Sequence, residues 1–219
     1  FITTYVKGDD AEKYYIVVNG CSSGNYDFSY IAGELTVAPA TFTLTVSGDY
    51  YYTGLAQSVS YTATGVGGAP LQAGTDFTAT GDIATGAGTY TLSLTGQKNY
   101  TGTVKAEWTI HKTYLLVKPV DEIITYNDDL PTFKEDYYGF VNGEDASVLG
   151  GTAVFTTPYK KGSPVDIYSV DVTGQTSGNY EIYAYQGMLA VMPATFTVSV
   201  IGDPVYNGVE QTVGYIVTG

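Results

Sequence analysis

The chain has 219 residues and a formal net charge of −13, from 22 acidic residues against nine basic ones, all of them lysine. A negative chain without arginine lacks the guanidinium fork that binds phosphate, and it repels a polyanion, which excludes nucleic acid as a partner. The 27 glycines and 22 tyrosines favour turns and strands over helices. No run of 18 apolar residues is present, so the sequence predicts no membrane-spanning helix.

The first strand signals lie at Tyr14–Val18 and Thr41–Ser47. Tyr14–Val18 is apolar throughout, which predicts a deeply covered strand. In Thr41–Ser47, Phe42, Leu44 and Val46 alternate with threonine or serine, which is the period-two pattern of a strand with one buried face. The beginning of the chain is therefore interpreted as a series of short strands.

The same alternation continues through the middle of the chain. Gly88–Thr95 and Thr103–Ile110 each place apolar residues on one face, namely Tyr90, Leu92 and Leu94 in the first and Val104, Ala106, Trp108 and Ile110 in the second. One helix-like stretch, Glu144–Leu149, predicts a single turn between strands. Short strands separated by glycine-rich turns predict an all-β chain of tandem small Ig-like β-sandwich domains arranged end to end, with β-grasp-like units as the alternative.

An internal repeat is visible when the chain is compared with itself. Phe1–Gly65 aligns without gaps onto Phe155–Gly219, and about 30 of the 65 aligned positions are identical. The copy at Thr195–Ile201 repeats the alternation of Thr41–Ser47, which predicts that its apolar residues Phe196, Val198 and Val200 also face a core.

The repeat distance is too long for one turn of a solenoid and favours two different small domains. Pro39-Ala40 and Pro193-Ala194 mark boundaries, because proline cannot join a central sheet ladder. A further boundary is expected near His111-Lys112-Thr113. The predicted domains are therefore a partial one at 1–39, complete ones at 40–112 and 113–193, and a partial one at 194–219.

Four segments of residues 113–193 form a recognisable set, namely Ile124–Asp128, Tyr138–Glu144, Ser177–Tyr180 and Gly187–Val191. Through these segments, residues 113–193 resemble the MBG-type repeat, a mostly bacterial glycine-rich domain. Residues 40–112 resemble the YDG-type repeat through Tyr52–Gly54, Ala87–Leu92 and Asn99–Thr103. Residues 1–39 then resemble the C-terminal part of an MBG-type domain, and residues 194–219 the N-terminal part of a second YDG-type domain. Tyr52-Thr53-Gly54 and Tyr206-Asn207-Gly208 depart from the Tyr-Asp-Gly of the family name.

The resemblance implies large, secreted, wall-associated bacterial proteins built from arrays of such modules. It also implies no catalytic residue that could be transferred to this chain. We therefore expect a protein of the cell surface or cell wall that is not an enzyme and holds no cofactor, and we assign no catalytic, cofactor-binding or metal-binding residue.

Three acidic clusters and one cysteine are the candidate metal-binding and reactive groups of the chain. The clusters are Asp9-Asp10, Asn127-Asp128-Asp129 and Glu144-Asp145. Calcium needs six to eight converging oxygens, and each turn supplies only some of them, so solvated turns are preferred and calcium stays the alternative. Cys21 would need a base, and the single histidine, His111, is its only candidate partner. An incidental loop residue is the preferred interpretation of Cys21.

Recurrent Asn-Tyr pairs and one lysine are further candidates for a specific role. Asn25-Tyr26, Asn99-Tyr100 and Asn179-Tyr180 are interpreted as a turn residue followed by a tyrosine that caps the core and bonds to backbone through its hydroxyl. Asn99-Tyr100-Thr101 is also a formal N-glycosylation sequon. Lys118 is the one candidate for an intramolecular isopeptide bond, and no such bond is expected because the closing strand Met188–Met192 offers no asparagine.

The leading functional hypothesis is a structural spacer in the stalk of a surface adhesin, with neighbouring repeats of the same protein as partners. The first alternative is a module that binds host glycan or mucin, since exposed aromatics stack on sugars. It requires Tyr50-Tyr51-Tyr52, and Tyr183 with Tyr185, to form an exposed patch. The second alternative is a subunit of a surface filament or surface layer, whose end domains are completed by neighbouring copies.

Overall fold

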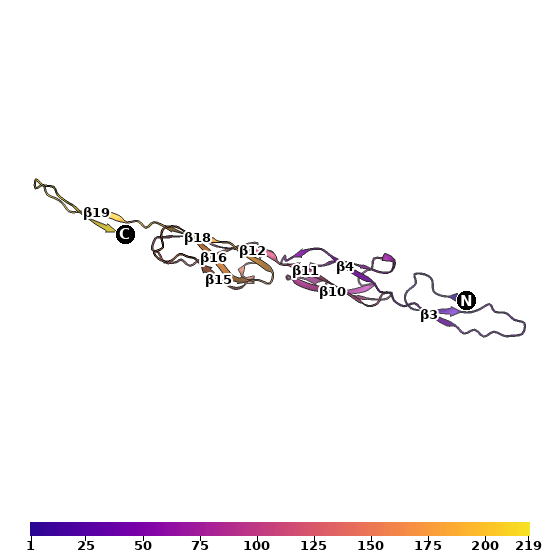
Figure 1. The fold of residues 1–219 in the computed structure, drawn as a ribbon. Coiled ribbons are helices and arrows are strands. Elements are labelled where there is room, and N and C mark those ends of the chain that lie inside the picture. Colours follow the sequence, from indigo (N-terminus) through magenta and orange to yellow (C-terminus); the bar gives the residue numbers. More distant parts are fainter. The chain divides into compact units, whose positions relative to one another are not determined.

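The computed structural model describes residues 1–219 and consists of 20 β-strands and two short 3₁₀ turns (Figure 1). The all-β prediction is confirmed. Neither helical turn has the length or the apolar character needed to cross a bilayer. The chain divides into two compact units, Phe1–Thr113 and Tyr114–Gly219. The boundaries expected after residues 39 and 193 stay predictions.

Residues 40–112 of the first unit form a sandwich-like arrangement of short strands. A four-stranded sheet has the order β5-β11-β10-β8, and β4 and β6 pair with β7 and β9 in two-stranded sheets. β4 contacts β11 of the larger sheet. The strands are β4 (Thr43–Ser47), β5 (Tyr50–Tyr51), β6 (Gln57–Ser58), β7 (Ser60–Thr64), β8 (Phe77–Thr80), β9 (Ile83–Ala84), β10 (Gly88–Gly96) and β11 (Thr103–His111).

The core of this arrangement is formed by the alternating residues of β10 and β11. Leu92 and Leu94 are fully buried, and Ile110 and Trp108 are 1% and 5% exposed. The indole Nε1 of Trp108 donates a hydrogen bond to the carbonyl oxygen of Gly81 at 2.9 Å, so its one polar group is satisfied in the core. The alternation predicted for these two strands is confirmed.

The first residues of the chain form a smaller sheet of β1 (Ile2–Thr3), β2 (Lys13–Val17) and β3 (Gly33–Thr36). The prediction of a deeply covered strand at Tyr14–Val18 is wrong. Tyr14 is buried, but Tyr15 is 62% exposed and Val17 is 44% exposed. β2 alternates like the other strands, because its side chains point in turn to the two faces of a single small sheet.

The second unit contains two sheets and a separate hairpin. The sheet orders are β14-β12-β17 and β13-β18-β16-β15, and β19 pairs with β20. A 3₁₀ turn at Ala146–Val148 confirms the single turn expected there. The strands are β12 (Thr113–Pro119), β13 (Glu122–Thr125), β14 (Glu135–Tyr138), β15 (Gly150–Thr156), β16 (Ile167–Thr176), β17 (Tyr180–Ala184), β18 (Gly187–Met192), β19 (Thr197–Ile201) and β20 (Gly214–Thr218).

Apolar residues of the two larger sheets are buried in the second unit. Leu115 and Val117 of β12 are fully buried, as are Val170 of β16 and Leu189 of β18. One cluster joins Phe133, Tyr159, Val170, Leu189 and Val191. Burial of several large side chains, at about 1.5–3 kcal/mol each, is the main contribution to the stability of such a unit.

Strand pairing recurs at the repeat distance of the sequence. The three pairs of strands β1–β2, β2–β3 and β4–β7 have counterparts in β15–β16, β16–β18 and β19–β20. Each counterpart has the same register: Ile2–Val17 and Thr156–Asp171, Lys13–Thr36 and Ile167–Ala190, Thr43–Thr64 and Thr197–Thr218. Equal registers in both copies show that these pairings follow from the local sequence.

Burial does not recur in the same way. Phe42 is 6% exposed, whereas its counterpart Phe196 is 70% exposed. Val198 and Val200 are also exposed, so the prediction that these three residues face a core is wrong. The cause is the surroundings of the hairpin, since β4 contacts β11 while β19 and β20 pair only with each other.

The Asn-Tyr pairs differ for the same reason. Tyr180 is 1% exposed, and its hydroxyl accepts a hydrogen bond from the backbone nitrogen of Val141 at 3.1 Å. The same hydroxyl donates to the carboxylate of Glu144. This is the core-capping role expected from the sequence. The equivalent Tyr26 is 76% exposed, and for this residue the expectation is wrong.

The two tyrosines provide a matched prediction. Tyr180→Phe removes a buried hydroxyl, so the Val141 N–H and the Glu144 carboxylate each lose their hydrogen bond to it. The expected decrease in the free energy of unfolding is about 1–3 kcal/mol. Amide hydrogen exchange in β16 and β18 should accelerate accordingly. Tyr26→Phe should change the exchange of β2 and β3 very little. Equal effects in both variants would contradict the capping role.

Candidate functional site

The candidate site is the outer face of the sheet formed by β14, β12 and β17. Alternation along β12 creates this face. Leu115 and Val117 are fully buried, while Tyr114 and Leu116 point the other way and are 61% and 37% exposed. A strand that buries every second residue must present the residues between them on its opposite face.

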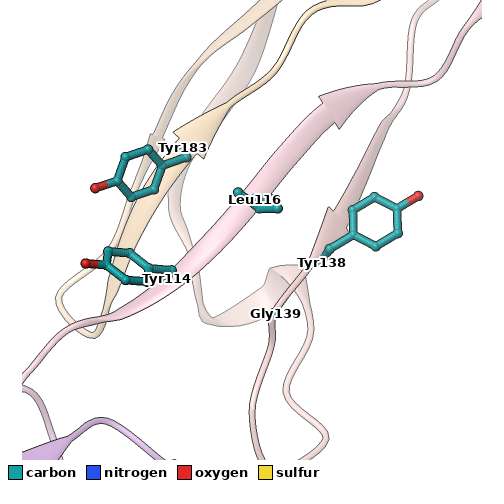
Figure 2. A pocket seen from close by; sticks show the side chains of 5 residues that line it. All are labelled: Tyr114, Leu116, Tyr138, Gly139 and Tyr183. Carbon is teal, nitrogen blue, oxygen red and sulfur yellow. The ribbon is translucent and has the colours of Figure 1, made fainter.

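Neighbouring strands add two further tyrosines to this face. Tyr138 of β14 lies opposite Leu116 in the antiparallel register and is 60% exposed. Tyr183 of β17 is 44% exposed, and its ring meets that of Tyr114 edge to face, with 5.4 Å between the ring centroids. Figure 2 shows Tyr114 and Tyr183 side by side, with Leu116 between them and Tyr138.

These residues line an open groove of about 490 Å³. We call Tyr114, Leu116, Tyr138, Gly139 and Tyr183 the tyrosine surface. Gly139 has a φ of 114°, and a Cβ built on it would lie 2.7 Å from the carbonyl oxygen of Tyr114. The position therefore requires glycine for both its conformation and its close approach to β12.

Charged side chains lie beside the tyrosine surface on the same strands. Lys118 of β12 lies opposite Asp136 of β14 in the register. A hydrogen bond to the Glu181 carboxylate, followed by partial burial, raises the pKa of the Tyr183 hydroxyl.

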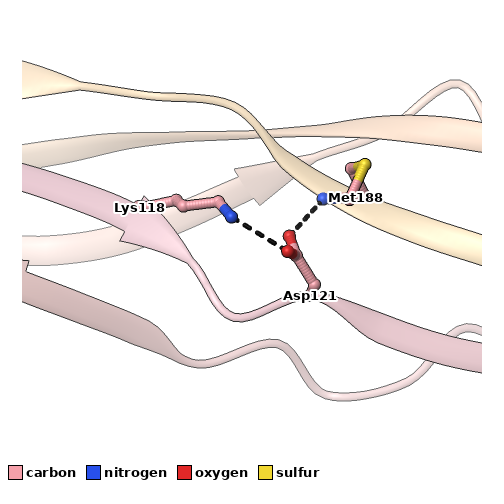
Figure 3. A network of polar contacts seen from close by, with 3 residues as sticks. All are labelled: Lys118, Asp121 and Met188. Atoms are coloured by element: carbon pink, nitrogen blue, oxygen red, sulfur yellow. Dashed lines mark hydrogen bonds and ion pairs between the residues drawn. The ribbon is translucent and has the colours of Figure 1, made fainter.

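Lys118 also belongs to a network that connects β12 with β18 (Figure 3). Its Nζ lies 2.9 Å from Oδ2 of Asp121, and the backbone nitrogen of Met188 donates to Oδ1 of Asp121 at 2.8 Å. The hydrogen bond from Lys118, and then the one from Met188, lower the pKa of Asp121. Lys118, the candidate for an isopeptide bond, is thus paired with the carboxylate of Asp121.

The tyrosines named from the sequence are only partly brought together. Tyr50-Tyr51-Tyr52 form no patch, since Tyr52 is 6% exposed and the Tyr50 ring contacts Trp108 at a centroid distance of 5.6 Å. Tyr183 does belong to the tyrosine surface, whereas Tyr185 is exposed without lining the groove. Tyr114 and Tyr138 were missed, although alternation within Tyr114–Val117 could have indicated the first.

The acidic clusters form turns. Oδ2 of Asp9 and of Asp128 accept hydrogen bonds from the backbone nitrogens three residues earlier, and Oδ1 of Asp145 accepts one from Ser147. Asp129 pairs with Lys161 at 3.0 Å. No three His, Cys, Asp or Glu side chains converge as a metal-binding group. These contacts are those of turn residues, and calcium binding is not assigned to any of them.

Cys21 and His111 have separate surroundings. The backbone nitrogen of Cys21, an exposed residue, donates to the hydroxyl of Tyr30 at 2.9 Å. His111 Nε2 lies 3.5 Å from Oδ1 of Asp49, and the ring of His111 lies 5.4 Å from that of Tyr51. The contacts of the two residues do not join them into a pair.

The family of one segment follows from comparison with known proteins. Residues 115–190 match the family described as MBG domain (YGX type). This segment runs from β12 to β18 and includes most of the tyrosine surface. The MBG resemblance of the sequence is confirmed for these residues. No curated protein matches the chain.

The Asp121 network predicts a pH dependence. Because the folded state lowers the pKa of Asp121, its stabilising contribution is present above the unfolded pKa of about 3.9 and is lost as pH falls through the folded value. Asp121→Asn should lower the free energy of unfolding at pH 7 by less than about 1 kcal/mol, since the pair is partly exposed. The difference from the unmodified chain should shrink at low pH.

Urea unfolding of both chains at neutral and acidic pH would measure this difference. Asp203→Asn, at an exposed acid outside the strands, is the matched control and should show no such change. A deficit of Asp121→Asn that stays constant with pH would contradict the network's electrostatic role.

Proposed function

We propose that this chain consists of non-catalytic spacer repeats from the stalk of an extracellular bacterial surface protein or adhesin. In this proposal, 40–112 is a YDG-type domain, 113–193 is an MBG-type domain, and 1–39 and 194–219 are parts of further domains of the two types. The partners are neighbouring repeats of the same protein. The observation that carries the proposal is the recurrence of identical strand registers at the repeat distance.

The short connections between the proposed domains support a spacer role. β11 ends at His111 and β12 begins at Thr113, so a single residue separates the two strands. No Gly/Ser-rich linker is present at this point or at Pro39-Ala40. Connections of this kind restrict the motion of neighbouring domains more than flexible linkers do.

Side-chain contacts across the boundary after Pro39 also support a spacer role. Oδ1 of Asn99 accepts a hydrogen bond from the backbone nitrogen of Ala11 at 2.6 Å, and its Nδ2 donates to Oδ1 of Asp10 at 2.7 Å. The Asn99 carbonyl also accepts from the backbone nitrogen of Ala40 at 2.8 Å. One asparagine in a turn thus bonds to residues on both sides of the proposed boundary.

The chemistry of the chain also supports a role without catalysis. The acidic side chains hold turns, and the single cysteine and single histidine have separate contacts. The filament or surface-layer alternative stays a prediction, and electron microscopy of the purified chain would test it through the presence of ordered assemblies.

Small-angle scattering tests the spacer proposal. A string of directly connected small domains should give an elongated particle, with a radius of gyration well above the roughly 17 Å expected for a compact domain of this length. A value near that of a globule would contradict the proposal.

Asn99→Ala tests the junction. The variant loses the two side-chain hydrogen bonds to Asp10 and Ala11, so amide exchange at Ala11 should accelerate by about tenfold while β10 and β11 keep their protection. Gln97→Ala in the same turn is the matched control, because only the backbone groups of Gln97 form hydrogen bonds to Asp76 and Tyr100. Unchanged exchange at Ala11 in Asn99→Ala would show that the junction does not depend on this side chain.

A further inference from the structure

We propose that the tyrosine surface binds neutral pyranose units of a glycan through stacking on its tyrosine rings. This activity goes beyond the spacer role and does not depend on it. The proposal assigns Tyr114 and Tyr183 as the main stacking residues, Tyr138 as the opposite wall of the groove, and Leu116 as its floor.

The first argument is the exposure of these side chains. Three tyrosines and a leucine from three different strands gather on one sheet face, while the core of the unit is completed by the opposite face through Leu115 and Val117. The fold therefore does not need these rings for its core. The rings are therefore available to a ligand.

The second argument is the size of the groove. A volume of about 490 Å³ lies in the range of small-ligand sites, which is about 300–1,000 Å³. The groove is therefore large enough for one or two sugar units.

The third argument is the chemistry of the lining. Tyrosine has an apolar ring with a polar hydroxyl at its edge, and it interacts with ligands that are apolar on one side and wet on the other. A pyranose has this character, with C–H groups on its faces and hydroxyls around its edge. The edge-to-face contact of Tyr114 and Tyr183 holds two rings in place before a ligand arrives.

Charge selects a neutral ligand. Lys118 lies opposite Asp136 in the register, and its ammonium group is paired with Asp121. The chain carries a net charge of −13. Sialylated, sulfated or uronic-acid sugars would be repelled by this excess of negative charge, and the repulsion weakens their binding.

A proline-rich peptide is the main competing ligand, because aromatic-lined grooves also bind polyproline helices. A polyproline helix has no backbone N–H to donate to a sheet edge, so it competes for the groove itself, whereas an extended peptide that is not proline-rich has a second route on this sheet. β14 and β17 are both at its edges, and their open backbone groups can pair with an added strand. The groove lies across the sheet face, where it offers rings rather than backbone partners.

The test is saturation-transfer NMR with the full chain and three sets of named probes. The neutral set is mannotriose, cellotriose and N-acetyllactosamine, the anionic set is 3′-sialyllactose and a heparin tetrasaccharide, and the peptide probe is a proline decamer. At about 10 mM probe, the level that detects millimolar affinity, we expect transfer to the C–H protons of at least one neutral sugar. No transfer to the anionic sugars or to the peptide is expected.

Variants locate the site. Tyr114→Ala and Tyr183→Ala should each weaken binding of the sugar at least about tenfold, with Tyr138→Ser on the edge strand as a further variant. Tyr126→Ala is the matched control, because Tyr126 is an exposed tyrosine of the same unit outside the groove. Hydrogen exchange of β12 and β18 verifies that each variant is folded.

Three outcomes would overturn the proposal: no transfer to any neutral sugar, stronger binding of the anionic sugars or of the peptide, or binding that survives Tyr114→Ala, Tyr183→Ala and Tyr138→Ser. None of these outcomes affects the scattering and exchange experiments on the spacer role, so the two proposals can fail separately.

Discussion

The alternation of side chains along β12 is the constraint on which the second unit depends. Leu115 and Val117 are fully buried, and this orientation leaves Tyr114 and Leu116 on the opposite face. A shift of the strand by one residue would exchange the two sets, exposing the core residues and burying the tyrosine. The same alternation therefore stabilises the core and creates the tyrosine surface, so a register shift of β12 would disrupt both.

The two copies of the repeat separate the causes of pairing from the causes of burial. β4–β7 and β19–β20 have the same register, yet Phe42 is buried and Phe196 is exposed. Pairing within a hairpin depends on residues close in the sequence, whereas burial depends on the sheet that lies across from it. Local interactions thus determine which strands pair, and long-range contacts determine which of their faces is buried.

The difference between local and long-range effects also explains what the sequence could predict. Alternation in β10 and β11 correctly predicted that Leu92 and Trp108 are buried, because both strands lie in a sheet with one covered face. The apolar run at Tyr14–Val18 was misread, since an apolar run does not show whether a second layer covers the strand. The choice between Ig-like and β-grasp-like topologies was beyond the pattern, because parallel pairs such as β5–β11 join distant segments.

The candidate site was predicted only in part. Tyr183 was named from the sequence, but its partners Tyr114 and Tyr138 come from strands that meet only through the order β14-β12-β17. The consecutive tyrosines 50–52 were more conspicuous and do not form a patch, because neighbouring residues of an extended chain point in opposite directions. Proximity in sequence was thus a poor guide to proximity on the sheet face.

The parallel pairing of β13 with β18 has a mechanical consequence. β13 lies near the beginning of the 113–193 segment and β18 at its end, and the two strands run side by side from the Glu122–Leu189 pair to the Thr125–Met192 pair. Tension applied at Glu122 and at Met192 would pull the two strands past each other along their length. The hydrogen bonds between them would then share the applied force and break together rather than one after another. Four residue pairs, from Glu122–Leu189 to Thr125–Met192, would therefore have to separate in one step.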